Sequence, residues 1–172
     1  IMAMKKEGAP FKGILFAGLM IKNNEPKLLE FNIRLGDPEA EAILPRLESD
    51  LIEIILKVLE GKLDEINLKF DERYAISVVM AAKGYPESYA KGDLINSLAQ
   101  KNHYQDVSIF HAGTRYDSDG NIVTSGGRVL VVTALDSDIK LAKEKAYHVV
   151  NQLKWDNCYF RRDIGWRLLG IK

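Results

Sequence analysis

The fold of the first part of this chain is decided by the stretch Leu29-Glu30-Phe31-Asn32-Ile33-Arg34-Leu35-Gly36-Asp37-Pro38-Glu39. Side chains of a β-strand alternate between its two faces, so apolar and polar residues separate here onto opposite faces. The turn-forming run Asn23-Asn24-Glu25-Pro26 precedes this strand, and an apolar run from Gly13 to Ile21 precedes the turn. The pattern predicts a β-hairpin, residues 13–21 paired with 27–35, with one core face and one face that carries chemistry.

Two helices are expected after the hairpin. Pro38 stands where a first helical turn begins, and Pro45 predicts a break. A longer helix is expected from a cap at Ser49 to Gly61, which suits the left-handed closing position. Its apolar residues recur at helical spacing and are interpreted as packing residues: Leu51, Ile54, Ile55, Val58 and Leu59.

The second part of the chain has the pattern of a small sheet covered by a helix. Strands are expected at 74–82, 107–113, 122–124 and 128–135, with Asp119-Gly120 as a hairpin turn. Residues 137–153 form an amphipathic pattern, which predicts the covering helix. A charged connector around 64–73 predicts domains at 1–70 and 71–172. The expected fold class is α+β, with antiparallel strands plus helices followed by a mixed, barrel-like sheet.

Composition excludes several classes of protein. The 172 residues carry 24 Lys plus Arg and 24 Asp plus Glu, so there is no basic field for nucleic acid and none is expected as a partner. Charges interrupt every apolar run, so no membrane association is expected. Cys158 is the only cysteine, which suits a reducing, cytoplasmic location, and its aromatic neighbours favour a packed thiol over a nucleophile. Residues 1–8 resemble the last turns of a helix closed by a glycine, which suggests that the sequence opens within a larger protein.

Glu30 and Asn32 are the strongest candidate site residues. They leave one face of the strand with their roots roughly 7 Å apart. A carboxylate and an amide carbonyl are hard oxygen ligands, and Mg²⁺ shares its shell with water and substrate phosphates. Arg34 continues this face, and Asp37 and Glu39 add carboxylates beyond it. The alternative is an ordinary solvated face, although Asn is disfavoured inside strands.

Longer runs of the sequence resemble the phosphoribosylamine-glycine ligase family of ATP-grasp enzymes. The first such runs are 13–20, 29–39 and 44–51. Further landmarks follow in the family's order, namely Val79-Met80-Ala81-Ala82-Lys83-Gly84-Tyr85-Pro86, Phe110-His111-Ala112-Gly113-Thr114, Gly126-Gly127-Arg128-Val129-Leu130, Ala146-Tyr147 and Arg162-Asp163-Ile164-Gly165-Trp166-Arg167. Essentially the whole chain is covered. The family usually has Cys and Phe where this chain has Ile33 and Leu35, both on the expected core face.

The resemblance implies the C-terminal part of an ATP-grasp domain followed by the family's C-terminal domain. It implies ATP, glycine and 5-phosphoribosylamine as substrates, Mg²⁺ or Mn²⁺ as cofactor, and the upstream part of the same enzyme as partner. Glu30 and Asn32 match the family's metal ligands, and Arg34 and Asp37 are hypothesised to place glycine or its acyl phosphate. The alternatives are another ATP-grasp carboxylate–amine ligase and a non-catalytic fragment.

Several other polar residues have two readings. Arg128, after Gly126-Gly127, is either a ligand for the ribose phosphate or part of a turn or bulge. His111 is interpreted as a buried, hydrogen-bonded histidine rather than a base. His103 and His148 are expected on the surface without partners. The Arg161-Arg162-Asp163 cluster is either an interface or cleft element or a local ion pair.

Overall fold

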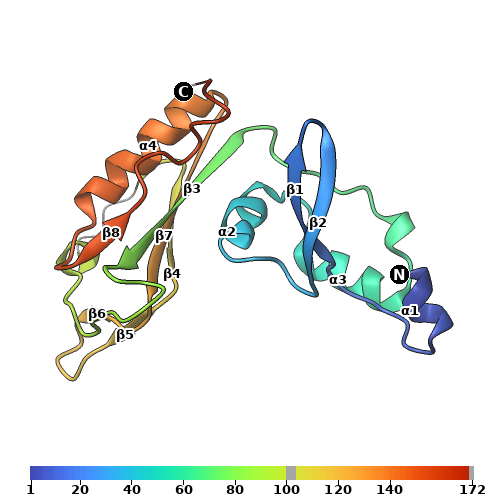
Figure 1. Cartoon of the computed structure of the whole chain (residues 1–172), viewed down its shortest axis with the longest axis horizontal. Coiled ribbons are helices and arrows are strands. Elements are labelled where there is room, and N and C mark those ends of the chain that lie inside the picture. Colours follow the sequence, from blue (N-terminus) through green and yellow to red (C-terminus); the bar gives the residue numbers. More distant parts are fainter. Residues whose placement is uncertain (100–103, 171–172) are drawn as a thin grey trace. The chain divides into compact units, whose positions relative to one another are not determined.

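The structure is a computed structural model that describes residues 1–99 and 104–170 and divides into two compact units (Figure 1). One unit comprises Ile1–Ala40 and Arg46–Asp71, and the other comprises Glu41–Pro45 and Glu72–Lys172. Helices occur beside antiparallel sheets in the chain, so the predicted α+β class is confirmed.

The first unit begins with a short helix and a hairpin. Helix α1 (Met2–Lys6) is followed by Gly8 at a φ of 78°, as the glycine-closed helix pattern predicted. Strands β1 (Phe16–Lys22) and β2 (Glu25–Asn32) pair antiparallel around Asn23 and Asn24, whose φ angles are 52° and 63°. Two consecutive positive φ angles make a two-residue type I′ turn, whose twist matches that of the strands. The turn is therefore shorter than predicted, and Pro26 lies within β2.

The hairpin contains a β-bulge that the sequence pattern did not predict. Gly18 pairs with Glu30 while Leu19 pairs with Leu28, so Leu29 is the extra residue. The apolar side chains Leu29 and Phe31 are 64% and 59% exposed. In the described residues this apolar face is not buried, so the prediction that it belongs to the core is wrong. The alternating pattern shows that one face of the strand is apolar, but it does not show which residues cover that face.

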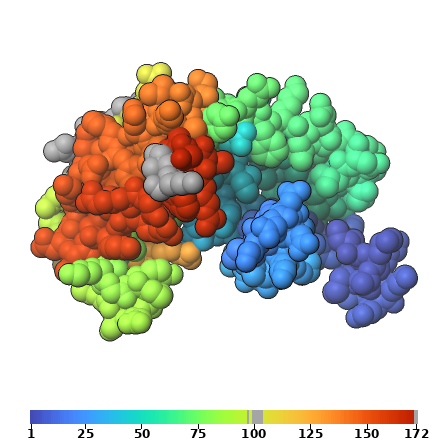
Figure 2. All heavy atoms as spheres, turned by 45° about the horizontal axis from the view of Figure 1, so that its top comes forward, coloured from blue at the N-terminus to red at the C-terminus, as the bar shows by residue number. Residues whose placement is uncertain are grey.

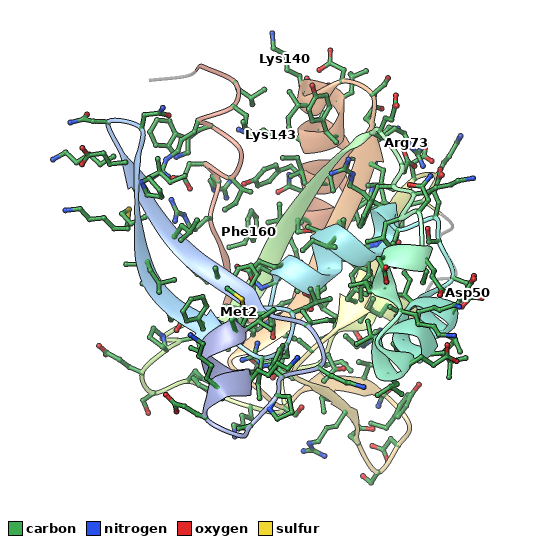
Figure 3. The ribbon with its side chains drawn as sticks, turned by 90° about the vertical axis from the view of Figure 1, so that its right-hand side faces the viewer. Met2, Asp50, Arg73, Lys140, Lys143 and Phe160 are labelled. Atoms are coloured by element: carbon green, nitrogen blue, oxygen red, sulfur yellow. The ribbon has the colours of Figure 1, made fainter. Side chains whose placement is uncertain are left out.

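The helices that follow the hairpin in sequence begin and end close to their predicted positions. Helix α2 (Glu39–Ile43) is followed by a 3₁₀ turn (Leu44–Arg46) that contains Pro45. Helix α3 (Leu51–Glu60) starts at Asp50 (Figure 3), whose carboxylate accepts hydrogen bonds from the backbone of residues 52 and 53, and it ends at Gly61 with a φ of 77°. The predicted cap at Ser49 is wrong, because the Ser49 hydroxyl accepts a hydrogen bond from the Lys69 amide instead.

The apolar stripe of α3 is less buried than predicted. Every residue of this helix keeps part of its surface exposed, including Leu59 at 61%. A further 3₁₀ turn (Leu63–Glu65) precedes an isolated bridge between Leu47 and Phe70. That bridge joins the two ends of the segment that carries α3.

The second unit is built on an open four-stranded sheet in the order β4-β7-β3-β8. Its strands are β3 (Tyr74–Ala82), β4 (Val107–His111), β7 (Arg128–Asp136) and β8 (Cys158–Phe160). Strands β5 (Thr114–Tyr116) and β6 (Ile122–Thr124) form a separate ribbon, and a 3₁₀ turn spans Asn96–Ala99. All pairings between the described strands are antiparallel. The expected mixed, barrel-like arrangement is therefore corrected to an open antiparallel sheet.

Helix α4 (Ile139–Gln152) covers one face of this sheet, as the amphipathic pattern predicted (Figure 1). Its buried residues Ala142, Ala146, Val149 and Val150 pack into one core with the central strands β3 and β7. Burial of each large aliphatic side chain in such a core contributes about 1.5–3 kcal/mol. Among the described residues, the buried hydrophobic core therefore lies in the second unit, and no comparable cluster occurs in the first. None of the described helices is long and apolar enough to cross a membrane.

Candidate functional site

Glu30 and Asn32 converge at the end of β2. The Asn32 Nδ2 atom donates a hydrogen bond of 3.0 Å to Glu30 Oε1, so the predicted meeting of these side chains is present. Glu30 is exposed and Asn32 is partly buried. Gly18 lies opposite Glu30, and a Cβ atom there would lie 3.2 Å from Glu30 Cγ. Gly18 was not singled out from sequence, although a glycine facing a functional strand is a signal that close approach is needed.

The chemistry of this pair suits a hard divalent cation. It supplies carboxylate oxygens and one amide oxygen, and Mg²⁺ takes few protein ligands when substrate phosphates complete its shell. The described residues contain no group of three or more His, Cys, Asp or Glu side chains arranged to hold a metal ion. A metal bound at the Glu30–Asn32 pair would therefore not have three such side chains from the described residues as ligands.

Arg34, Asp37 and Glu39 follow the strand but do not extend its face. Strand β2 ends at Asn32, and the Arg34 Nη1 atom donates to the Leu35 carbonyl at 2.9 Å. The prediction that Arg34 continues the Glu30 face is wrong, because the backbone bends after Asn32. Asp37 lies in a turn, and Glu39 opens α2 with its carboxylate packed over Gly36, where a Cβ atom would collide with it.

Arg34 also lines an apolar hollow of about 480 Å³ within the first unit. The other walls come from residues 12–14, from Ile33 and Leu35, and from the exposed stripe of α3. The apolar residues of α3, which were predicted to pack in a core, therefore line the walls of an open hollow instead.

Arg128 belongs to the second unit, at the start of β7. It pairs with Ala81 while Leu130 pairs with Met80, so β7 carries a bulge at this point. A Cβ atom at Gly127 would collide with the Tyr85 ring. Close packing and a bulge therefore account for the Gly126-Gly127 pair.

The histidines differ in part from their predicted roles. His111 Nδ1 and Thr114 Oγ1 are 2.9 Å apart, but the ring is exposed, so only the predicted hydrogen bond is confirmed. The ring lies at the exposed end of β4, where the core no longer covers the strand. His148 is exposed as predicted, but its Nε2 atom lies 2.9 Å from Gln152 Nε2, so the expectation that it has no partner is wrong. His103 lies outside the described residues.

The structure agrees with two interpretations that assign no catalytic role, namely a local ion pair at Arg161 and a packed thiol at Cys158. Arg161 and Asp163 form a local two-point ion pair, with Nε–Oδ1 and Nη2–Oδ2 distances of 2.9 and 2.5 Å. Burial raises the pKa of the Cys158 thiol to about 11, as expected for a packed and unreactive side chain.

Residues 75–167 match the family described as phosphoribosylglycinamide synthetase, C domain, and residues 1–40 match its ATP-grasp (A) domain. The chain belongs to the phosphoribosylglycinamide synthetase family. Within that family the hairpin with Glu30 and Asn32 lies in the part matched to the ATP-grasp domain, and Arg128 lies in the part matched to the C domain.

Individual members of the phosphoribosylglycinamide synthetase family match along nearly the whole chain. The chloroplastic phosphoribosylamine–glycine ligase of Arabidopsis thaliana is 48% identical over 100% of this chain and 33% of its own length. The Escherichia coli K12 phosphoribosylamine–glycine ligase is 46% identical over 98% of this chain and 39% of its own length. The crystal structure of the Thermotoga maritima enzyme of that name superposes with a TM-score of 0.79 at 33% identity, covering 94% of this chain and 39% of that one. The chain thus spans between a third and two fifths of these relatives.

Proposed function

We propose that this chain is part of an ATP-dependent ligase that joins glycine to 5-phosphoribosylamine in purine biosynthesis. The products are glycinamide ribonucleotide, ADP and phosphate. Its relatives carry the name phosphoribosylamine–glycine ligase, and they match both of its units. At residue level the proposal depends on one observation: the side chains of Glu30 and Asn32 meet and form a hydrogen bond.

The reaction has two steps that need no protein nucleophile. An oxygen of the glycine carboxylate attacks the terminal phosphorus of ATP, the bond to the bridging oxygen breaks, and ADP leaves. The amine of phosphoribosylamine then attacks the carbonyl carbon of the resulting acyl phosphate, and phosphate leaves as the nitrogen loses a proton. Such chemistry depends on positioning and charge neutralisation, which agrees with the unreactive state of Cys158.

Glu30 and Asn32 would hold the divalent metal, Mg²⁺ or Mn²⁺. A bound cation neutralises negative charge on the transferring phosphates. Asn32 now turns its amide nitrogen toward Glu30, so metal binding requires rotation of the amide that brings Oδ1 to the ion. Glu30 is exposed and Gly18 opposite it leaves room, so the carboxylate can reach a ligand without a change in the backbone.

The neighbouring charged residues are proposed to position the substrates. The guanidinium group of Arg34 has five N–H donors, and its bond to the Leu35 carbonyl uses only one nitrogen. The rest of the fork is available for the carboxylate of glycine or for a phosphate. Asp37 and Glu39 lie close to Arg34 in sequence and are proposed to bind the glycine ammonium group. Arg128 is proposed to bind the ribose phosphate.

The remaining part of the same enzyme is proposed as the partner of the first unit. Leu29, Phe31 and Ile33 are 59–75% exposed, and α3 keeps an apolar surface. Surfaces of this kind are covered by other protein when the protein is complete. We place the domain boundary at residues 70/71 and the protein in the cytoplasm.

The test is ADP release by the complete ligase with Mg²⁺, ATP, glycine and phosphoribosylamine, with each substrate omitted in turn. Release that requires both glycine and phosphoribosylamine is expected. Release supported equally by other carboxylates would assign the chain to a different ATP-grasp ligase. Failure to release ADP under any of these conditions would favour a non-catalytic role.

A further inference from the structure

The β-bulge in β2 lies next to Glu30. From the turn to Leu28 the two strands of the hairpin pair without a break, whereas beyond Leu29 the pairing is shifted by one residue. Continuing the first register would place Ala17 opposite Glu30. The extra residue changes this partner, so that Gly18 lies opposite Glu30 instead.

The shifted register gathers the polar residues of β2 on one face. Side chains that lie directly opposite each other in an antiparallel pair project from the same face. The pairs on the face with the polar residues are Lys22–Glu25, Met20–Lys27, Gly18–Glu30 and Phe16–Asn32. The pairs on the apolar face are Ile21–Pro26, Leu19–Leu28 and Ala17–Phe31. In an unbroken register Glu30 and Asn32 would share the face of Leu28, so the bulge determines which face carries them.

Gly18 is suited to this position because it has no side chain. A Cβ atom there would lie 3.2 Å from Glu30 Cγ and 3.7 Å from the Glu30 carbonyl oxygen. A contact of 3.2 Å between carbon atoms is closer than their ordinary separation of about 3.5–4.0 Å. Gly18 is not among the glycines with positive φ, so other residues could adopt its backbone conformation. The space that Glu30 occupies is therefore the reason for a glycine here.

Two contacts define the position of the Glu30 side chain. Its Cγ atom lies over Gly18, and its Oε1 atom accepts the hydrogen bond of 3.0 Å from Asn32 Nδ2. Gly18 is partly buried and Glu30 is exposed, and Figure 2 shows the hairpin, in mid-blue, at the surface. The carboxylate therefore stays accessible to a ligand while the stem of the side chain lies against β1.

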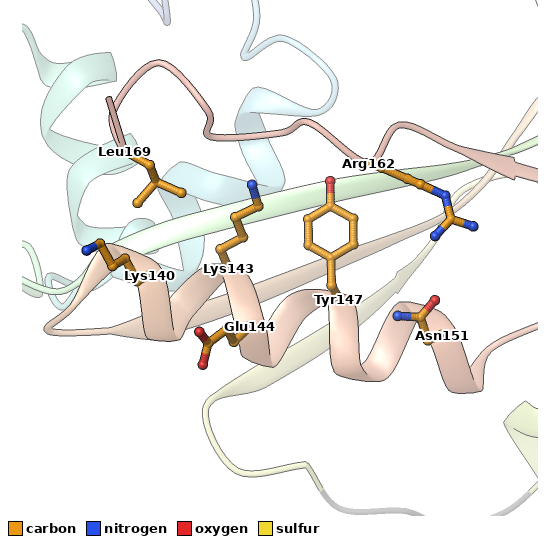
Figure 4. A pocket seen from close by; sticks show the side chains of 7 residues that line it. All are labelled: Lys140, Lys143, Glu144, Tyr147, Asn151, Arg162 and Leu169. Atoms are coloured by element: carbon orange, nitrogen blue, oxygen red, sulfur yellow. The ribbon is translucent and has the colours of Figure 1, made fainter. Parts of the chain in front are cut away.

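The cations beside α4 show no such convergence. Figure 4 shows the Tyr147 ring between Lys143 and Arg162, with Arg162 directed away from the ring. Glu144 lies on the other side of the helix. These side chains line one hollow, but they do not share a position for one ligand, whereas the two side chains at the end of β2 do.

We propose that Gly18 is a positioning residue for the metal pair, and that the bulge at Leu29 brings it opposite Glu30. Gly18 contributes no side-chain ligand and acts only through Glu30, whose carboxylate meets Asn32 because no Cβ atom crowds its stem. The inference rests on the proposed assignment of Glu30 and Asn32 to the metal. It adds that this assignment requires a residue without a side chain at position 18.

The test compares Gly18→Ala with Ala17→Ser in the complete ligase. Each substitution adds one heavy atom to β1, but only residue 18 lies opposite Glu30. The added methyl group pushes the Glu30 side chain from its place beside Asn32, so the apparent constant for Mg²⁺ activation of ADP release should rise by about threefold to tenfold. Turnover at saturating Mg²⁺ should stay within about twofold, and Ala17→Ser should change neither quantity by more than about twofold.

Metal binding is also measured without turnover. Mn²⁺ is titrated into the complete ligase with ADP present, and the electron paramagnetic resonance signal of the unbound ion reports binding. Gly18→Ala should weaken Mn²⁺ binding by the same factor as it raises the Mg²⁺ constant. Thermal unfolding should show no loss of stability, because alanine is less costly than glycine within a strand. A weaker metal site in an equally stable protein distinguishes positioning from a general loss of structure.

Glu30→Gln separates failure of this inference from failure of the metal assignment. Weaker Mn²⁺ binding in both Glu30→Gln and Gly18→Ala, with Ala17→Ser unchanged, is the expected result. Unchanged binding in Glu30→Gln would show that the metal assignment itself is wrong. Weaker binding in Glu30→Gln with unchanged binding in Gly18→Ala, or equal weakening by Ala17→Ser, would overturn the role of Gly18 alone.

Discussion

Tyr147→Phe removes the hydroxyl that joins α4 to the segment after β8. That hydroxyl makes one hydrogen bond of 2.7 Å to Arg161 and one of 3.2 Å from Ile164. A typical intramolecular hydrogen bond contributes about 0.5–1.5 kcal/mol, and the longer of these two lies at the weak end. The free energy of unfolding should therefore fall by about 1–2 kcal/mol, which corresponds to a fall in Tm of about 2–8 °C for a chain of this size.

Urea unfolding followed by circular dichroism measures this loss, and amide exchange at Ile164 measures it locally. Tyr159→Phe is the matched control, because Tyr159 is 56% exposed and its hydroxyl has no hydrogen-bond partner among the described residues. The control should change the free energy of unfolding by less than about 0.5 kcal/mol. Equal effects of the two substitutions, or unchanged exchange at Ile164 in Tyr147→Phe, would refute the reasoning.

Three further predictions concern single side chains. Asp50→Ala should lower the free energy of unfolding by about 1 kcal/mol in urea titration, because two amides at the start of α3 lose their acceptor, and an equal loss in the exposed control Glu48→Ala would contradict this. The Arg73 guanidinium and Lys145 ammonium groups lower the pKa of Asp106, so its contribution to stability is present above the ordinary carboxyl range near pH 4 and is lost as the pH falls further. Asp106→Asn should therefore flatten the fall of Tm on acidification, whereas Asp156→Asn should not; equal slopes in the two variants would count against the ion pairs. Alkylation of Cys158 by iodoacetamide at pH 8 should be about 100-fold slower than that of an ordinary thiol of pKa 9.0, because burial raises its pKa to about 11, and a rate near that of a free thiol would show that it is not packed.

Much of the fold was predictable because local chemistry and tertiary packing agree. The asparagines at 23 and 24 accept positive φ, which fixes the hairpin turn, and Gly61 closes α3 for the same reason. The apolar spacing of α4 identified the face that packs on the sheet.

The misses have physical causes that a single sequence does not reveal. Strand β8 has three residues, too few for an alternating pattern, and it forms only by pairing with the edge of β3. Ser49 and Asp50 are equally good helix caps, and the choice between them is made by Lys69, distant in sequence, which binds the Ser49 hydroxyl. The bulge at Leu29 shifts the register of β2, which no propensity indicates.

The candidate site was predictable only where it depended on strand geometry. The two-residue spacing of Glu30 and Asn32 correctly predicted that their side chains meet. Arg34 lies two residues farther on, but the strand ends before it, so the same rule failed there.

The most direct test of the metal-site assignment compares Glu30→Gln with Glu25→Gln in the complete ligase, by Mg²⁺-dependent ADP release. Both residues lie on β2 and both are exposed, but only Glu30 meets Asn32. The account predicts that Glu30→Gln lowers turnover by about 100-fold or more, with unchanged thermal unfolding, and that Glu25→Gln stays within about twofold of the original enzyme. Near-normal turnover of Glu30→Gln would contradict the assignment of Glu30 to the metal and its phosphates.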